Sequence, residues 1–181
     1  MSHAIDFDAL DEKLFLLQQL VFASKPYCKR QAIGNESDVG EANKDEYWGW
    51  IKSLTSNYLI ECAVKTRVFH DYLRNSHFEN DFDRIDADAC QGLTIATISK
   101  GAFAITLRET CNKIIHATRV VLVWNDTRNN QYWGGKLLLL GKKGAESWEL
   151  ELNIGDWALA MTRYHKALEE SEGRVYAGQD W

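Results

Sequence analysis

Three side chains with chemical capacity recur at four-residue steps in one short stretch of this sequence. Arg108, Asn112 and His116 lie within residues 106–117. On a helix of about 3.6 residues per turn, that spacing places them along one gently drifting stripe. An imidazole exchanges protons near neutral pH and a guanidinium stabilises negative charge, so a stripe of this kind suits work on an anionic group. The segment is the first candidate for a functional site.

The same segment carries the signals of a helix with a buried side. Thr106 followed three residues later by Glu109 is a capping box, in which each side chain satisfies a backbone N–H of the first turn. The positions that can supply the buried side are Leu107, Cys111, Ile114 and Ile115. We therefore predict a helix over about 107–117, which carries the polar stripe into or beside the core.

The composition is that of one folded domain. The chain has 181 residues, of which 45% are hydrophobic and 12% aromatic, including seven Trp. Such a chain can bury a substantial core, and we expect a single domain over 1–181. The net charge of −5 argues against binding nucleic acid by bulk attraction, so any such contact must come from a local basic patch.

The sequence indicates a cytoplasmic protein with no membrane contact. The N-terminus lacks the basic and apolar regions of a signal peptide, and no run approaches the ~20 apolar residues that span a bilayer. Four cysteines lie far apart with no C-x-x-C pair. This spacing favours reduced, mostly buried thiols over disulfides or a zinc site.

Helical patterns flank the candidate stripe on both sides in the sequence. Apolar stripes and capping residues predict three further helices, over about 6–24, 44–74 and 156–170. Lys25-Pro26 is expected to end the first of them. The polar, glycine-bearing segment 27–42 is interpreted as a loop, and no function is assigned to it.

Three strand-like runs follow the candidate helix, over about 119–124, 132–140 and 147–152. Turn residues separate them, which is typical of a small antiparallel meander. The short apolar segment 93–98 is left without an assigned element. The predicted fold class is therefore mainly α with a small antiparallel β element of three strands, an α+β fold.

The sequence of the candidate helix resembles the signature helix of the HEPN family, all-helical bundles of bacterial defence and toxin systems. The family's motif is an Arg, often followed by Asn, then three variable residues and His. Asn112, His116 and the small Ala117 match this pattern, whereas the position of the motif's Arg is Cys111. The nearest arginine on the helix, Arg108, lies one turn earlier. The resemblance covers this helix and, loosely, the long preceding one; the meander is an addition to the plain family bundle.

The resemblance implies a metal-independent endoribonuclease of a toxin–antitoxin or antiviral defence system. It also implies that the protein needs no cofactor. Members of the family are commonly homodimers in which two such helices face each other, so the resemblance implies a homodimer here. His116 would exchange a proton with an RNA 2′-hydroxyl or the 5′-leaving oxygen. Arg108 would stabilise charge on the phosphate, and Asn112 would orient the histidine or contact a non-bridging oxygen. The alternative is a non-catalytic HEPN-like dimerisation or adaptor module of the antitoxin type, which binds a cognate protein.

Two residues of the long helix are candidates for supporting roles. Glu61 and Arg67 lie among apolar neighbours, where an isolated charge is disfavoured and needs a partner. Either can reach Arg108 or His116 from the neighbouring helix and fix the imidazole. A purely structural buried ion pair is the alternative that physical chemistry favours.

The meander carries the basic–aromatic cluster of the sequence. Its members can hold single-stranded RNA by stacking and phosphate contact, with solvated hairpin lysines as the alternative; they are Lys136, Lys142, Lys143 and Trp133. A metal-dependent phosphohydrolase reading of His70-Asp71 with His77 is disfavoured, because a metal site needs three or four converging ligands.

Overall fold

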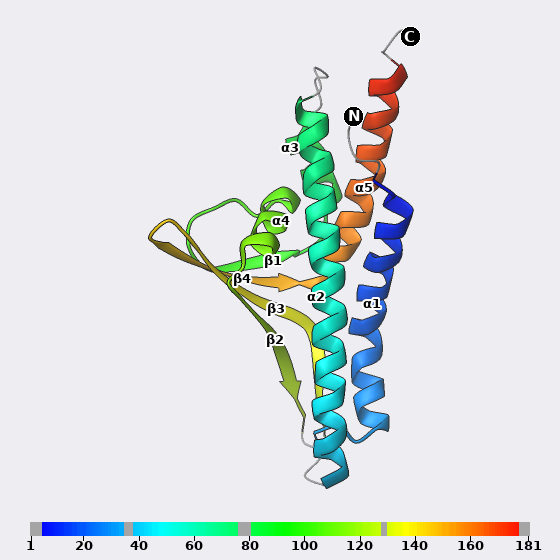
Figure 1. The fold of residues 1–181 in the computed structure, drawn as a ribbon, viewed down its shortest axis with the longest axis vertical. Helices are drawn as coiled ribbons and strands as arrows, with labels where there is room; N and C mark the ends of the chain where they lie inside the picture. The colour runs from blue at the N-terminus through cyan, green and yellow to red at the C-terminus, as the bar shows by residue number, and fades with distance from the viewer. Residues whose placement is uncertain (1–4, 35–37, 76–80, 128–129, 178–181) are drawn as a thin grey trace.

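The computed structural model describes residues 5–34, 38–75, 81–127 and 130–177. It shows an α+β fold, in which long helices lie beside a small antiparallel sheet (Figure 1). The predicted fold class is confirmed. Within the described ranges the helices are α1 (Phe7–Arg30), α2 (Asp38–Asn75), α3 (Phe82–Ala89), α4 (Leu107–His116) and α5 (Ile154–Ala177), and the strands are β1 (Ala96–Lys100), β2 (Arg119–Asp126), β3 (Gln131–Lys143) and β4 (Glu146–Asn153).

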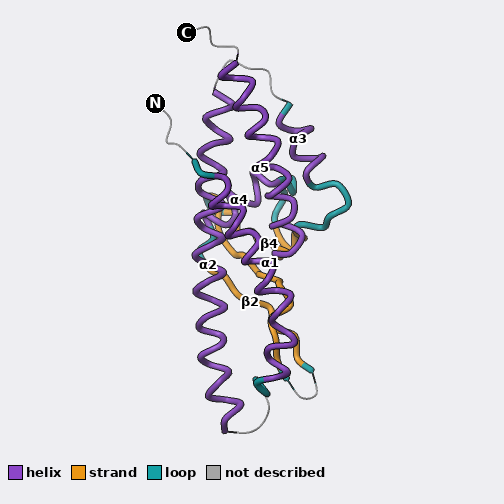
Figure 2. Tube along the Cα trace, turned by 90° about the vertical axis from the view of Figure 1, so that its right-hand side faces the viewer, coloured by secondary structure: helices purple, strands orange, loops and turns teal. Residues whose placement is uncertain are grey.

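The long helices α1, α2 and α5 run along the long axis of the molecule, with α1 antiparallel to the other two (Figures 1 and 2). α1 packs against α2, α5 and the strand β3. Most of the largest fully buried side chains come from α1, the sheet and α5, with one each from α2 and α4; they include Leu10, Leu14, Leu17, Trp133, Leu137, Trp157, Tyr164, Leu73 and Leu107. No helix within the described ranges is long and apolar enough to cross a bilayer.

The sheet has the strand order β1-β4-β3-β2, and each neighbouring pair is antiparallel. β2, β3 and β4 form the predicted meander. The prediction of three strands is wrong in one respect, because β1 adds a further strand at the edge of β4, where Ala96 lies opposite Leu152. The five residues of β1 carry too little periodicity to predict a strand, and a partner far along the chain decides their conformation.

The first helix does not end at Lys25-Pro26, as the sequence predicts, but continues through Pro26 to Arg30. A proline inside a helix leaves one carbonyl without its N–H partner. Here Pro26 is exposed, so water can satisfy that carbonyl, while Cys28 is buried and holds the final turn in the core. The loop between the first two helices is shorter than the predicted range 27–42, because α1 extends to Arg30 and α2 already begins at Asp38.

A buried histidine joins the three long helices. His165 of α5 is fully buried. Its Nε2 lies 2.7 Å from the hydroxyl of Thr66 on α2, and its Nδ1 lies 2.7 Å from the carboxylate of Asp11 on α1. Since buried polar groups are costly unless paired, this contact fixes how the helices are placed relative to one another.

The short helix α3 has no counterpart among the predicted elements. Its N-cap is Asp81, whose carboxylate accepts a hydrogen bond from the backbone N–H of Arg84 over 3.1 Å. Asp86 of α3 in turn accepts from the backbone N–H of Leu107 over 2.8 Å, at the start of α4. A carboxylate at a helix N-terminus is favourable because it meets unpaired donors and the positive end of the helix dipole. The helix α3 therefore sets where the candidate helix begins.

Candidate functional site

The capping box of α4 forms in one direction only. The Thr106 hydroxyl accepts from the backbone N–H of Glu109 over 3.0 Å, as predicted. The Glu109 carboxylate instead accepts from Asn112 Nδ2 over 2.9 Å and pairs with Lys113 Nζ over 3.1 Å. Burial alone would raise the pKa of Glu109, but its hydrogen bonds with Asn112 and Lys113 outweigh burial and lower the pKa. Glu109 is therefore an anion that orders this side of the helix.

A cleft of about 410 Å³ opens along this side of α4. Its lining comes from α2, α4, β3 and β4, and consists of Arg67, Glu109, Asn112, Lys113, His116, Lys142, Lys143 and Trp148. Four of these side chains are lysine or arginine and one is a carboxylate. The cleft is thus a local basic site on a chain whose net charge is −5. An anion is the ligand class that such a cleft attracts.

His116 lines this cleft. It is the last residue of α4, and its side chain is exposed. A ligand in the cleft can therefore reach the imidazole directly. This accessibility is the geometric requirement for a histidine that transfers a proton to or from a bound molecule.

Arg67 of α2 reaches the cleft and contacts the candidate helix. Its Nε donates a hydrogen bond to Asn112 Oδ1 over 2.8 Å, and its guanidinium forms an ion pair with Asp71. Burial of Asp71 would raise the pKa of that carboxyl, but its hydrogen bonds and charge interactions with Arg67 and Arg108 lower it. A guanidinium anchored on two sides in this way is preorganised to face an anion.

Arg108, which the stripe placed with His116, does not line the cleft. Its Nη2 lies 3.4 Å from Asp71 Oδ1. The reason is helical geometry: each four-residue step overshoots one turn by about 40°, so two steps turn Arg108 away from His116 by about 80°. The structure brings Asn112 and His116 together with Arg67, and it leaves Arg108 outside.

Cys111, at the position of the motif's arginine, is turned into the core and is 1% exposed. Burial raises the pKa of its thiol, which stays neutral. An arginine at this position would place a charge in an apolar environment, which is unfavourable without a partner. The arginine that lines the cleft, Arg67, belongs to α2.

Lys113 is a cleft residue that the sequence reasoning missed. Its side chain is largely buried, and Nζ lies 4.0 Å from the ring centroid of Phe103 and 4.5 Å from that of Trp148. The two rings and the Glu109 carboxylate compensate the buried ammonium group. The spacing of Glu109 and Lys113, four residues apart on one helix, was the signal that could have predicted their pairing.

The glycine at position 141 makes room for this arrangement. Gly141 on β3 lies opposite Trp148 on β4. A Cβ at Gly141 would overlap the indole ring, so only glycine lets the ring lie flat against the strand. The ring then forms part of the cleft beside Lys113.

The predicted basic–aromatic cluster is divided by the sheet. Lys142 and Lys143 are exposed and line the cleft. Lys136 does not line it, and its Nζ pairs with Glu151 across the strands over 2.6 Å. The assignment of Trp133 to RNA stacking is wrong, because the side chain is fully buried and its Nε1 donates to the Lys136 carbonyl over 2.9 Å.

Glu61 does not support the candidate helix. Its carboxylate pairs with Lys65 Nζ over 2.6 Å and with Lys13 Nζ over 3.5 Å, and it does not line the cleft. The hydrogen bond from Lys65 lowers its pKa. The expected reach of Glu61 to Arg108 or His116 is therefore replaced by an ion pair on the surface of α2 and α1.

Two of the residues considered for a metal-dependent phosphohydrolase site have other partners. His70 Nδ1 lies 2.5 Å from the Tyr164 hydroxyl, and Asp71 pairs with arginines. His77 lies outside the described residues. Within the described ranges, no three His, Cys, Asp or Glu side chains are grouped as metal ligands.

Comparisons of this chain with protein-family models, with curated proteins and with solved structures gave no significant match. A functional proposal therefore rests on the cleft and on the side chains that line it.

Proposed function

We propose that this protein is a HEPN-like endoribonuclease of a bacterial defence or toxin–antitoxin system, which acts in the cytoplasm and cleaves RNA without a metal ion. The observation that carries the proposal is the exposed imidazole of His116 in a cleft that Arg67, Lys142 and Lys143 make basic. RNA supplies both groups that this cleft suits: a phosphate for the cations and a 2′-hydroxyl for the imidazole.

The reaction can be written with the side chains of the cleft. The cations hold the phosphate, and His116 takes the proton of the adjacent 2′-hydroxyl. The 2′-oxygen forms a bond to phosphorus while the bond from phosphorus to the 5′-oxygen breaks, and the leaving oxygen takes up a proton from the imidazolium or from water. The products are a 2′,3′-cyclic phosphate end and a free 5′-hydroxyl end. Positively charged donors stabilise the charge that develops on the phosphate.

Arg67 takes the role that the resemblance gives to an arginine of the signature helix. It lines the same cleft as His116, whereas Arg108 does not. Its hydrogen bond to Asn112 joins it to the helix that carries the histidine. Asn112 then positions the arginine and lines the cleft itself.

The test is cleavage of labelled single-stranded RNA in the presence of a chelator. We expect wild type to produce cyclic-phosphate ends and His116→Ala to be slower by about a hundredfold or more, the usual contribution of a general acid–base. A DNA strand of the same sequence serves as the control, because it lacks the attacking hydroxyl. Equal rates for wild type and His116→Ala would contradict the proposal.

The second candidate is a non-catalytic adaptor of the antitoxin type that binds a cognate protein. The observation that favours it is the ion pair between Arg108 and Asp71, which occupies the arginine of the candidate helix within the chain. This candidate predicts that wild-type protein leaves RNA intact in the same assay, while an acidic partner segment binds the cleft.

A further inference from the structure

A smaller recess adjoins the cleft of His116. It has a volume of about 60 Å³, and its lining comes from the segment before α4, from α4 itself and from the hairpin of β3 and β4. The two hollows share part of their lining, namely Glu109, Lys113, Lys143 and Trp148. The reaction proposed above uses the phosphate and the 2′-hydroxyl of RNA and leaves the base without a contact. The recess is the place beside the cleft where a base can bind.

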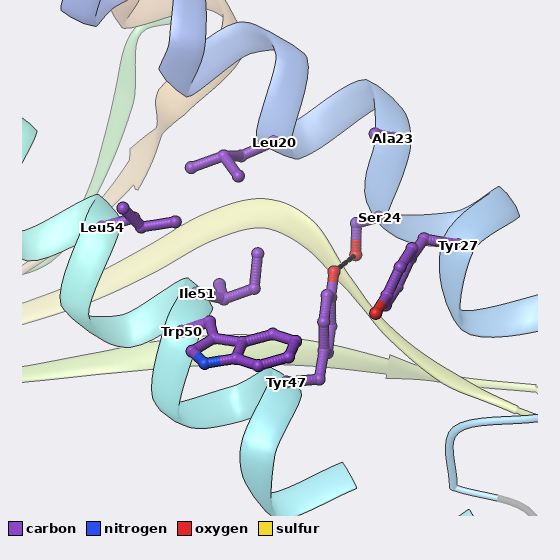
Figure 3. A pocket seen from close by; sticks show the side chains of 8 residues that line it. All are labelled: Leu20, Ala23, Ser24, Tyr27, Tyr47, Trp50, Ile51 and Leu54. Atoms are coloured by element: carbon purple, nitrogen blue, oxygen red, sulfur yellow. Dashed lines mark hydrogen bonds between the residues drawn. The ribbon is translucent and has the colours of Figure 1, made fainter. Parts of the chain in front are cut away.

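The apolar groove between α1 and α2 is a poor alternative place for a nucleotide (Figure 3). The described residues that line this groove include no charged side chain. The Tyr47 hydroxyl donates to the Ser24 hydroxyl over 2.7 Å, so these two polar groups of the lining are paired with each other. A nucleotide in this groove would find no cation for its phosphate. The recess, by contrast, lies next to the cations of the cleft.

The recess has an aromatic wall. Phe103 and Trp148 meet edge to face, with their ring centroids 6.5 Å apart. Gly101, with a φ of +103°, allows this contact, because a Cβ there would crowd both side chains at 3.2 Å. Unpaired bases of RNA are flat and aromatic, and they pack against aromatic side chains. The recess therefore suits one edge of a planar ring, while the ribose and phosphate stay in the larger cleft.

Glu109 lines both the recess and the cleft. An ionised carboxylate offers about four lone-pair positions for hydrogen bonds. Asn112 Nδ2 donates to one oxygen over 2.9 Å, and Lys113 Nζ lies 3.1 Å from the other. The side chain of Glu109 is still 29% exposed. Each of its oxygens can therefore accept a further hydrogen bond from a ligand.

A carboxylate with both oxygens open matches two donors that lie side by side. Guanine alone among the four bases of RNA has such a pair, at N1–H and at the N2 amine. Adenine and cytosine place a ring-nitrogen acceptor beside their amine, and uracil places its N–H between two carbonyl oxygens. A carboxylate repels these acceptors, so the contact that favours guanine also disfavours the other bases.

The spacing of Glu109 and His116 fits a single nucleotide. The two residues are seven apart on α4. Seven residues correspond to about 10.5 Å along the helix axis and return to within about 20° of the same azimuth. This separation is comparable with the length of one nucleotide, from the Watson–Crick edge of its base to its 3′-phosphate. One guanosine can thus place its base edge at Glu109 and its 2′-hydroxyl at His116.

We propose that the recess is a guanine-binding subsite, in which the Glu109 carboxylate accepts hydrogen bonds from N1–H and the N2 amine of the nucleotide whose 2′-hydroxyl faces His116. This inference rests on the proposed ribonuclease function. It specifies the substrate as RNA that is cut on the 3′ side of guanosine. Glu109 is then a specificity-determining residue as well as a partner of Asn112 and Lys113.

The first test is the binding of nucleoside 3′-monophosphates to the wild-type chain, measured by isothermal titration calorimetry. Guanosine 3′-monophosphate is expected to bind at least about tenfold more tightly than the adenosine, cytidine and uridine compounds, the discrimination typical of a bidentate contact to a base. Inosine 3′-monophosphate keeps N1–H but lacks the amine, and it is expected to bind at least about fivefold more weakly than the guanosine compound. Equal affinities for guanosine and inosine, or no preference among the four bases, overturn the proposal.

The second test removes the carboxylate. Glu109→Gln replaces one acceptor oxygen by an N–H donor, so the ratio of guanosine to adenosine affinity is expected to fall to about one. The matched control is Glu146→Gln, which neutralises a carboxylate that lines the recess but not the cleft; this variant keeps the ratio of wild type. Thermal melts check that both variants fold. If Glu109 only orders Asn112 and Lys113, its substitution changes all four affinities by the same factor, and that result overturns the proposal.

Mapping of the cleavage sites separates this inference from the ribonuclease function on which it rests. Cuts confined to the 3′ side of guanosine support both. Cuts after all four bases at equal rates retain the ribonuclease and overturn the guanine subsite. A preference for guanosine 3′-monophosphate in a protein that leaves RNA intact supports the subsite and overturns the ribonuclease.

Discussion

Arg67 Nε on α2 donates a hydrogen bond to Asn112 Oδ1 on α4 over 2.8 Å. This contact joins the longest helix to the helix of the candidate site. Asn112 Nδ2 in turn donates a hydrogen bond to the Glu109 carboxylate, which forms an ion pair with Lys113. One wall of the cleft is thus a connected polar network, and connected networks hold their members in defined positions.

We expect Arg67→Ala to reduce RNA cleavage or binding far more than Arg108→Ala does. Loss of a charge-assisted contact costs about 1.5–3 kcal/mol, which is at least a tenfold effect. Arg108 lies outside the cleft, so its removal has a small effect. Rates and dissociation constants of the two variants decide the matter, with thermal melts as the folding control. A larger loss for Arg108→Ala would mean that Arg108, and not Arg67, stabilises the charge on the phosphate.

Removal of Lys142 and Lys143 together should weaken the binding of single-stranded RNA and reduce its salt dependence. Each phosphate contact contributes about 0.7 to the slope of log affinity against log salt, so two contacts contribute about 1.4. Lys136→Ala is the matched control, because this lysine pairs with Glu151 outside the cleft. Fluorescence anisotropy titrations at several salt concentrations measure both quantities. An unchanged slope in the double variant would mean that these lysines do not contact phosphate.

Stability should fall in mildly acidic solution because of His70. Burial, with the nearby charge of Arg108, lowers the pKa of His70 to about 4, whereas an unfolded histidine titrates near about 6.5. Between these values the unfolded chain binds more protons, so stability is present above about pH 6.5 and is lost toward pH 4.

The slope from one such group is at most about 1.4 kcal/mol per pH unit. Urea unfolding of wild type and His70→Gln at several pH values tests this expectation. The variant loses the contact with Tyr164 and is less stable at neutral pH, but its stability depends less on pH. Parallel curves for the two proteins would assign the acid sensitivity to other groups.

Trp133→Phe should lower stability without affecting RNA binding. The indole is fully buried and its N–H is hydrogen-bonded, so the smaller ring leaves a cavity and an unpaired carbonyl. The expected loss is about 1–3 kcal/mol in the free energy of unfolding. Denaturant titration measures it, and an RNA-binding titration serves as the second readout. Weakened binding at full stability would restore Trp133 to the surface role that the sequence suggested.

Features of this fold that depend on neighbouring residues could be predicted from the sequence, whereas features that depend on contacts between distant residues could not. The N-cap at Thr106 and the alternation of β4 are local patterns, and both appear in the structure. At Pro26 the local pattern predicts wrongly, because α1 continues through a proline that would usually end a helix. The buried Cys28 beyond the proline belongs to the shared core, and burial outweighs one missing hydrogen bond.

The sequence by itself determined the α+β class, the candidate helix and the place of Asn112 and His116 upon it, because helical and strand periods are properties of neighbouring residues. Only the tertiary structure decided which cations accompany the imidazole. Arg67 approaches from α2 and Lys142 and Lys143 from β3, while Arg108 is turned away. Spacing along one helix sets an azimuth, but which side chains share a cleft depends on how separate elements pack, and that is a long-range property of the folded chain.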